Sequence, residues 1–455
     1  MFQQQQIQTV TTEKYLPFQI SRVRLAPIFG TQTPPLVLTG TFQEEVNSLC
    51  AWQYRPSATY ANNFLNAPLH DSGLPSVLAD SEDEPRLACS VVHPGDVQQL
   101  KVHTDSQLVF TGSSMGFVGI YRLAVPKDTS DVFSLSKLHF WTRTPKSDCD
   151  NSDDDFIPQD VPISDVSFSA DASQLYVGDD LGQLTVLDTE TLVPKVKTAV
   201  SARGFDVATI NAIEVIDDEC IATANQVGQL NLWDLRSPLR DNLPQRRIIP
   251  AASPSSPPES AHRSLSNVNF LASPSATTPL ITLTHLLGIQ SANDGLVFFL
   301  FSMGEPRPLV CLSQHPGQPH LLAVGGINSH VVSNKKSTST CYIWDLRADQ
   351  HPLSELDCPG TAVWEIKFHP TQPQQLYLAT EEAGLVRVQS TSPSESWSYM
   401  EGARKKLSAV CAMQKPTGCC SVHTFDLLGG LLICGRDNGV LQTIQDPSTS
   451  VFSFA

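Results

Sequence analysis

The tetrapeptide Trp-Asp-Leu-Arg occurs twice in this chain, at 233–236 and 344–347, and each copy ends a β-like segment. The first copy closes a unit of three segments: INAIEV (210–215), CIATAN (220–225) and GQLNLWDLR (228–236). Such a recurring unit constrains the fold more than composition does, because each unit must bury its apolar face against the next one. The chain is therefore expected to consist of stacked repeats.

Six further matches to this unit follow with their segments in the same order. They span 20–54, 97–123, 163–188, 308–347, 362–389 and 421–444. A period of roughly 40–45 residues that ends in Trp-Asp is typical of WD40 repeats, in which four antiparallel strands form one blade of a β-propeller. The chain is thus predicted to be all-β, a seven-bladed WD40 propeller in which 1–455 form a single domain. Trp233, Asp234, Trp344 and Asp345 are its structural WD motifs.

The middle segment of each unit is apolar on both faces, as expected for a strand packed between blades near a crowded axis. Each one includes a small residue: Gly40, Gly112, Gly178, Ala222, Gly325, Ala379 or Gly435. More polar segments are predicted to be outer strands, at 86–92, 137–144, 193–200, 246–251 and 352–358. An open last blade would expose an unpaired strand edge, so EKYLPF (13–18) is predicted to complete the seventh blade and close the ring.

Seven blades of roughly 42 residues account for about 300 residues, so the rest of the chain is expected to be long loop insertions between blades. These are predicted at 55–85, 145–160, 240–305 and 390–420, as surface loops. Their compositions include an acidic run, a Ser/Pro tract and the basic cluster ARKK, which is typical of solvated loops. The apolar stretch 281–301 is interrupted at its centre by polar residues, which favours an extra hairpin, or an artefact of the gene model, over a membrane span.

Composition argues against several classes of function. The formal net charge is −16, from 30 basic and 46 acidic residues, which disfavours direct binding of nucleic acid. The N-terminus MFQQQQIQTV lacks a basic region followed by an apolar core, so no secretory signal is expected and an intracellular protein is favoured. Most of the eleven cysteines fall inside predicted strands and no CxxC pair exists, which favours buried free thiols over metal ligands.

The sequence also lacks the patterns that indicate catalysis or cofactor binding. No GxSxG, HExxH, Walker or GxGxxG motif is present. His93, His315 and His369 each precede a proline, and turn chemistry explains them better than catalysis. The acidic run at 147–155 lacks the glycine and final glutamate of a calcium loop. We therefore expect no enzyme activity, no cofactor and no metal site, and a rigid platform that binds partners.

Several segments together resemble a known family. They are HPGDVQQLKV (93–102), GQLNLWDLR (228–236), SQHPGQPHLLAVGG (313–326), AVWEIKFHPTQPQQLYLATEEAGLVR (362–387) and VHTFDLLGGLLICGRDNG (422–439). In this order they are similar to the forty-three-kilodalton WD40-repeat nucleoporin family of the Y-shaped outer-ring complex of the nuclear pore. The degenerate ending HTFDLLG, in place of Trp-Asp, makes the likeness more specific than a general WD40 match. This chain is longer than the family pattern, chiefly at 240–305 and 145–160.

This resemblance implies a non-enzymatic structural scaffold in the nucleus, at the nuclear pore complex of the nuclear envelope. It implies docking on helical-solenoid nucleoporins of the short arm of the Y complex, and support of pore assembly, mRNA export and protein transport. A mitotic role at the kinetochore is a further implication. No membrane insertion and no self-oligomerisation are expected. Two alternatives stay open: a substrate receptor of a ubiquitin ligase, and an assembly platform in chromatin or RNA processing.

Candidate interaction and regulatory residues can be named from their positions. Surface-prone aromatics in outer strands, loops and the C-terminal tail are candidate docking residues: Trp141, Trp397, Tyr399 and Phe452. The alternative is that these rings only cover the outer strands. Serines that precede proline are candidate phosphorylation sites: Ser237, Ser253, Ser256, Ser273 and Ser392. Each would gain nearly two negative charges, although the prolines could equally serve only to keep these loops extended.

Overall fold

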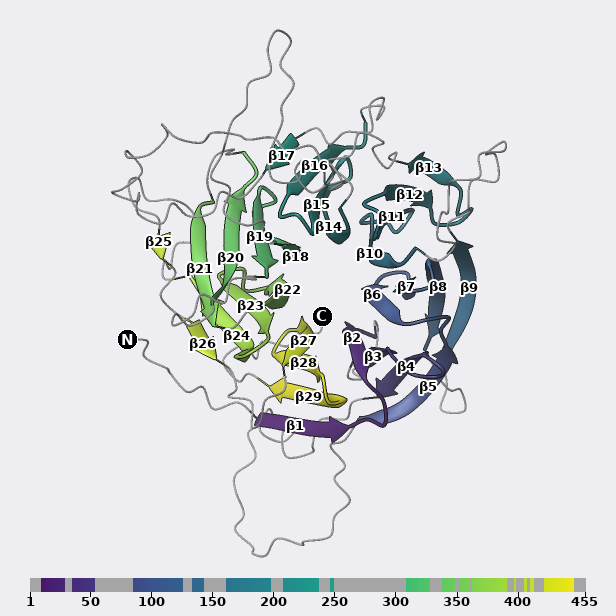
Figure 1. Cartoon of the computed structure of the whole chain (residues 1–455). Helices are drawn as coiled ribbons and strands as arrows, with labels where there is room; N and C mark the ends of the chain where they lie inside the picture. The colour runs from purple at the N-terminus through teal and green to yellow at the C-terminus, as the bar shows by residue number, and fades with distance from the viewer. Residues whose placement is uncertain are drawn as a thin grey trace, which may run out of the picture.

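The computed structural model describes residues 10–28, 35–53, 85–125, 133–142, 161–197, 208–236, 246–248, 308–327, 338–347, 352–359, 362–390, 397, 405–406, 410–412 and 421–445. Within these ranges the chain forms strands and turns and contains no helix. The strands assemble into seven sheets that are arranged as blades around a central axis (Figure 1). The predicted all-β, seven-bladed propeller is therefore confirmed.

Each of the first four blades has four strands, numbered from the axis outward. Blade one comprises β2 (Ile20–Ala26), β3 (Leu36–Thr41), β4 (Ser48–Gln53) and β5 (Arg86–Val92). Blade two comprises β6 (Val97–His103), β7 (Leu108–Ser113), β8 (Phe117–Ala124) and β9 (Ser134–Thr142). Blade three comprises β10 (Ile163–Phe168), β11 (Gln174–Asp179), β12 (Leu184–Asp188) and β13 (Pro194–Lys197). Blade four comprises β14 (Ile210–Asp217), β15 (Cys220–Asn225), β16 (Leu230–Asp234) and β17 (Arg246–Ile248).

In the last three blades, an outer strand is very short or comes from a distant part of the chain. Blade five comprises β18 (Leu309–Gln314), β19 (Leu321–Gly326), β20 (Thr338–Asp345), β21 (Ser354–Pro359) and the parallel β25 (Lys405–Lys406). Blade six comprises β22 (Val363–Phe368), β23 (Gln375–Thr380), β24 (Gly384–Gln389) and β26 (Val410–Ala412). Blade seven comprises β27 (Val422–Leu428), β28 (Leu431–Arg436), β29 (Val440–Gln445) and β1 (Val10–Tyr15).

The N-terminal strand closes the ring, as predicted. β1 pairs antiparallel with β29 from Val10 opposite Gln445 to Tyr15 opposite Val440. The strand begins three residues before the predicted segment 13–18 and ends within it. Strands from the two terminal regions of the chain therefore share one sheet, so β29 is paired on both sides and its edge is not exposed (Figure 1).

The predicted outer strands are confirmed as β5, β9, β13, β17 and β21, with ends that shift by a few residues. The predicted loop insertion 390–420 contains two short strands that were not predicted, β25 at 405–406 and β26 at 410–412, which add to blades five and six. Strands of two or three residues are too short to show an alternating pattern, so only their pairing reveals them. The predicted insertions 55–85, 145–160 and 240–305 lie almost wholly outside the described residues.

Each innermost strand contains the same irregularity, which sets what faces the axis. Its pairing register shifts by one residue near its start, and the shifts fall between Ile20 and Arg22, Val97 and Gln99, Ile163 and Asp165, Ile210 and Ala212, Leu309 and Cys311, Val363 and Glu365, and Val422 and Thr424. A bulge of this kind redirects the side chains around it. Seven equivalent bulges thus align equivalent positions of all seven blades around the axis.

The small residues of the middle strands receive the next blade, as predicted. A Cβ built on Gly40 would lie 2.5 Å from Val97 Cγ1, the first residue of the next innermost strand. The same contact recurs at Gly178 against Ile210, and at Gly435 against Ile20, where blade seven meets blade one. In blade four the register places Ala224, not the predicted Ala222, at the equivalent position opposite the bulge. The chain repeats one steric fit around the whole ring.

Candidate functional site: the polar cluster at the axis

A central cavity of about 910 Å³ lies between the innermost strands, and residues from all seven of them line it. These strands contribute four basic lining residues, Arg22, Arg24, Lys101 and Lys367, and four acidic ones, Asp165, Glu214, Glu365 and Asp426. Their formal charges balance. Asp180, in the turn after β11, adds one more carboxyl group to the wall, which is therefore polar with only a small acidic excess.

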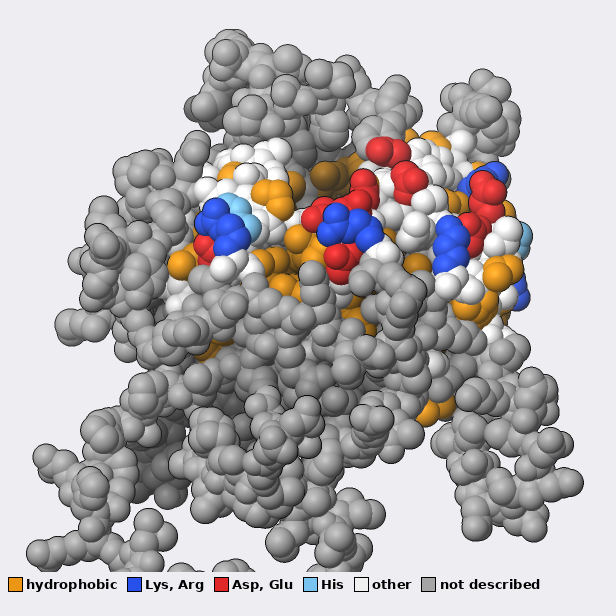
Figure 2. All heavy atoms as spheres, turned by 90° about the horizontal axis from the view of Figure 1, so that it is seen from above, with side chains coloured by type: hydrophobic (Ala, Val, Ile, Leu, Met, Phe, Trp, Pro, Cys, Tyr) orange, Lys and Arg blue, Asp and Glu red, His pale blue; other side chains and the backbone are white. Residues whose placement is uncertain are grey.

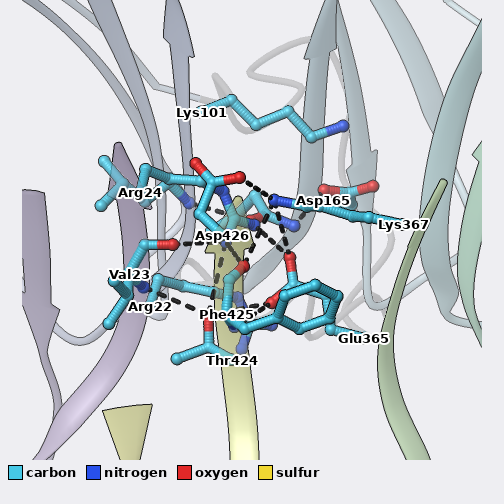
Figure 3. Close-up of polar contacts among 12 residues, drawn as sticks. Arg22, Val23, Arg24, Lys101, Asp165, Glu365, Lys367, Thr424, Phe425 and Asp426 are labelled. Atoms are coloured by element: carbon cyan, nitrogen blue, oxygen red, sulfur yellow. Dashed lines mark hydrogen bonds and ion pairs between the residues drawn. The ribbon is translucent and has the colours of Figure 1, made fainter. Parts of the chain in front are cut away.

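Arg24 is the centre of the densest group of contacts, which joins blades six, seven and one (Figure 3). Its Nη2 lies 2.8 Å from Glu365 Oε1 across blade seven, and its Nη1 donates to Thr424 Oγ1 at 3.3 Å. Lys367 Nζ pairs with Asp426 Oδ1 at 2.9 Å and with Glu365 Oε1 at 3.4 Å. Two basic and two acidic side chains thus form one continuous ionic network.

The same side chains accept hydrogen bonds from the backbone of the neighbouring blade. Glu365 Oε2 accepts from the amide of Phe425 at 3.0 Å, and Asp426 Oδ2 accepts from the amide of Leu25 at 2.7 Å. Thr424 Oγ1 accepts from the amide of Val23 at 3.1 Å. Every acceptor lies on one innermost strand and its donor on the next, so these contacts hold adjacent blades in register.

This pattern continues around the rest of the ring. Arg24 donates to Gln99 at 3.2 Å, and Gln99 donates to Asp165 at 2.5 Å. Asp165 accepts from the amide of Ile213 at 2.5 Å. Blades four and five are linked by the amide of Gln314, which donates to Glu214 at 2.8 Å, and blades five and six by the amide of Phe368, which donates to Ser313 at 3.1 Å. A polar contact therefore links every pair of adjacent blades at the axis.

Charge keeps Glu365 ionised inside this network. Burial alone would raise the pKa of its carboxyl, but Arg24 and Lys367 outweigh burial and lower the pKa to about 2. A buried carboxylate that is paired and also accepts an amide hydrogen bond is stable in its charged form. The group is thus held as a structural ion and is not poised to exchange a proton near neutral pH.

Ser421, His423 and Asp437 form a second cluster at the start of blade seven, with the residue types of a catalytic triad. Ser421 Oγ lies 2.9 Å from His423 Nε2, and His423 Nδ1 lies 2.6 Å from Asp437 Oδ1. The Ser421 hydroxyl also donates to Asp437, and Ser421 is only 5% exposed. Nucleophilic catalysis needs a serine that faces its substrate. This cluster instead ties β27 to the turn after β28.

The described residues offer no alternative metal or redox centre. Within them, no group of three His, Cys, Asp or Glu side chains could hold a metal ion. Seven cysteines in these ranges form no disulfide, and burial raises the pKa of Cys434 to about 12. His93, His315 and His369 are buried in turns, as their His-Pro sequences predict. No helix in the same ranges has the length and apolarity to cross a membrane.

The two predicted WD motifs end the third strands of blades four and five. Trp233 Nε1 donates to Thr223 Oγ1 at 2.9 Å, whereas buried Trp344 Nε1 has no hydrogen-bond partner. Each motif also forms an ion pair on the rim, Arg236 with Asp234 and Arg347 with Asp345. Figure 2, which views the disc edge-on, shows basic and acidic side chains side by side along the rim. The motifs thus have structural contacts inside the blade and on its surface.

The expectation that Trp141 and Trp397 lie on the surface is wrong. Trp141 is 9% exposed and packs with Phe110 and Val118 between blades two and three. Trp397 is 3% exposed, and its Nε1 donates to Pro373 O at 3.0 Å. Both rings are therefore buried within the propeller and are not available as surface docking residues. The other candidates lie outside the described residues: Tyr399, Phe452, Ser237, Ser253, Ser256, Ser273 and Ser392.

The polar residues at the axis were not recognised from the sequence as a connected group. Their strands were predicted, but the partner of Arg24 is Glu365, which is about three quarters of the chain length away in sequence. One signal could have found them. In each innermost strand, pairing resumes at one residue after the bulge, such as Arg22 in β2. The residue two positions after that one is charged in five blades, although the strand faces a crowded axis: Arg24, Lys101, Glu214, Lys367 and Asp426.

The fold and the axial cluster together define this chain as a closed, seven-bladed WD40 propeller. Comparison with known proteins adds a specific likeness. The human protein Nucleoporin Nup43 is 23% identical over 457 aligned residues, which cover 93% of this chain and 95% of the human protein. The mouse protein of the same name is 22% identical over 458 residues, with the same coverage of both chains. No family model matches the chain.

These similarities confirm the resemblance that the sequence indicated. They extend over nearly the whole of both proteins, so they include all seven blades and not only the WD motifs. A general repeat match would not require the irregular blades six and seven to align together with the regular ones.

Proposed function

We propose that this chain is a non-enzymatic scaffold subunit of the nuclear pore complex. The observation that supports this proposal most directly is the full-length similarity to proteins named Nucleoporin Nup43. The structure is compatible with it, because the polar side chains at the axis are used to join blades and the result is a rigid disc. Function in such a disc resides in its outer surfaces.

At finer detail, we infer that the disc docks on helical-solenoid nucleoporins of the short arm of the Y-shaped outer-ring complex. Support of pore assembly, mRNA export and protein transport, and a mitotic role at the kinetochore, follow only from the resemblance and remain predictions. The inferred location is the nuclear envelope at the pore. A solenoid presents helix ridges, and a propeller rim can receive them through apolar anchors surrounded by polar groups.

Affinity purification of the tagged full-length chain at moderate salt tests this proposal. Stoichiometric recovery of the outer-ring nucleoporins, with tagged protein at the nuclear rim, is the expected result. Recovery of ubiquitin-ligase subunits, or of histones or RNA, in place of nucleoporins would refute it. An Arg236→Met variant is a suitable control, because it removes only the rim ion pairs of exposed Arg236 with Asp234 and Glu219.

A further inference from the structure

Blade one exposes more apolar surface on its outer strand than blade two does. Leu87 and Val92 of β5 are 54% and 66% exposed, and Val46, in the turn between β3 and β4, is 60% exposed. Within the described ranges only six large apolar side chains are exposed, and these three lie on one blade. Scattered exposed apolar residues need no explanation, but neighbouring ones on an outer strand do.

The outer strand of blade two shows what a strand facing water looks like. In β9 the apolar residues Leu135 and Trp141 are buried, and the exposed positions are polar, such as Lys137 and His139. In β5 this alternation fails. An exposed outer strand with an apolar face invites association, and proteins that leave it bare usually cover it with a partner.

A bulge explains how the apolar residues of β5 reach one face. The pairing of β4 with β5 shifts between Ala51 opposite Cys89 and Trp52 opposite Leu87, so Ala88 is the extra residue. After this shift Leu87, Ser90 and Val92 share one face of the strand, and Cys89 and Val91 share the other. Cys89 and Val91 pack against the core between blades one and two. The face with Leu87, Ser90 and Val92 therefore points away from blade two.

Val46 extends this face at the end of the strand. Ser48 pairs with Val92, and the amide of His93 donates to Asn47 O at 2.9 Å, which places the turn 42–47 beside Val92. We call Val46, Leu87, Ser90 and Val92 the blade-one face. β5 has seven residues, so this face is about 20 Å long, the length of about four turns of α-helix.

The charged residues at the two ends of the blade-one face indicate which charges a binding partner would have. At the Val46 end lie the acidic residues Glu44, Glu45 and Asp96, and the described turns 42–47, 93–96 and 114–116 contain no Lys or Arg. At the Leu87 end lie Lys14, whose Nζ donates to Pro85 O, and the exposed Arg86. A partner with an apolar ridge and a basic end would match both features.

We propose that the blade-one face docks an amphipathic α-helix of a helical-solenoid partner, with its apolar ridge on Leu87 and Val92 and its Lys or Arg residues against Glu44 and Glu45. This inference rests on the proposed function, because it takes the partner to be a solenoid nucleoporin. It adds the surface that binds and the chemistry of the helix.

Binding of the purified full-length chain to recombinant outer-ring solenoid subunits of the same organism, tested one at a time, provides the test. The double variant Leu87→Ser/Val92→Ser should weaken binding to the cognate subunit by about tenfold or more. Glu45→Lys should weaken it less and remove part of its salt dependence. Val193→Ser is the matched control, because Val193 is 59% exposed on blade three, and it should leave the dissociation constant within about twofold. Unchanged thermal midpoints confirm that all variants are folded.

A photo-crosslinking residue at position 92, with one at position 193 as the control, identifies the occupant. Crosslinks from position 92 to a Lys- or Arg-bearing helix of the solenoid are expected. If a solenoid subunit binds the wild-type chain and the double variant equally well, the inference is overturned and the proposed function stands. If no solenoid subunit binds the wild-type chain, both are overturned. Crosslinks from position 92 to a second copy of this chain, with dimers in sedimentation, would also overturn the inference.

Discussion

The interface between blades seven and one differs from the interface between blades four and five in how its polar contacts are made. Blades four and five share an apolar cluster that includes Trp344, and their polar contacts run from a side chain to the backbone, such as Asn211 Nδ2 to Leu309 O at 2.7 Å. A carboxylate accepts a backbone amide at both interfaces, Glu214 from Gln314 and Asp426 from Leu25. Blade one adds an ion pair, because Arg24 reaches across blade seven to Glu365.

This difference has a topological reason. Blades four and five follow each other along the chain, so covalent linkage keeps them close in any partly folded state. Blade seven meets blade one only when the two ends of the chain come together, and closing so long a loop costs entropy that local contacts do not offset. The interface between blades seven and one is therefore stabilised by two sets of contacts, the β1–β29 pairing at the rim and the ionic cluster at the axis.

The largest expected effect comes from removing Arg24 from the ionic cluster at the axis. Arg24→Met leaves the Glu365 carboxylate buried without its closest cation, so we expect the free energy of unfolding to fall by about 3 to 5 kcal/mol. Urea unfolding followed by tryptophan fluorescence measures it. Arg236→Met, which removes the exposed ion pairs of Arg236 with Asp234 and Glu219 on blade four, should leave the urea midpoint almost unchanged. Equal losses in the two variants would show that the axial cluster has no special role.

A smaller effect is expected from crowding the same interface. A Cβ on Gly435 would lie 2.8 Å from Ile20 Cγ2, so Gly435→Ala should cost about 1 to 3 kcal/mol through overpacking. Blade four already has Ala224 at the equivalent position, so its neighbour accommodates a methyl group. Gly317→Ala is the control, because the nearest atom to a Cβ built there is His315 Cε1, at an ordinary contact distance of 3.7 Å. Thermal unfolding of the wild type, Gly435→Ala and Gly317→Ala measures the two effects. Equal midpoints for the two variants would show that the added methyl group at the interface between blades seven and one has no specific cost.

Acid should weaken the ionic cluster at the axis, because it protonates Glu365. The pKa of Glu365 is lowered to about 2 in the folded state, so its stabilising contribution is complete above its ordinary pKa and is lost as pH falls toward 2. Between pH 5 and 3 the wild type should lose on the order of 2 kcal/mol more than Glu365→Gln does. Urea midpoints of both proteins across this interval measure the difference. Parallel pH profiles would mean that other carboxylates dominate the acid response.

The sequence predicted the ring better than it predicted what holds the ring together. The innermost and middle strands were placed correctly because their apolar runs and small residues reflect burial between blades, which is a local property. The short outer strands β25 and β26 were missed because their position depends on pairing with β21 and β24.

The candidate site residues failed for a related reason. Trp141 and Trp397 were assigned to the surface because they lie in polar segments, yet both rings fold back over a core that sequence alone does not show. The Arg24–Glu365 contact was not predictable at all, since it needs all seven blades in place to bring blades six and one together. Closure of the ring is thus the one property that no single repeat encodes.

The smallest expected effect tests the two identical WD motifs, of which Trp344 packs between blades four and five and Trp233 between blades three and four. Register places Thr223 of blade four and Val324 of blade five at equivalent positions, each two residues after the partner of its tryptophan. Thr223→Val removes the acceptor of the Trp233 indole and should cost about 1 kcal/mol. Val324→Thr offers Trp344 the acceptor that it lacks, so it should cost less, or stabilise blade five. Urea unfolding of both variants measures the two changes. If Val324→Thr costs as much as Thr223→Val, burial of a hydroxyl outweighs the indole hydrogen bond, and the two tryptophans are held by packing alone.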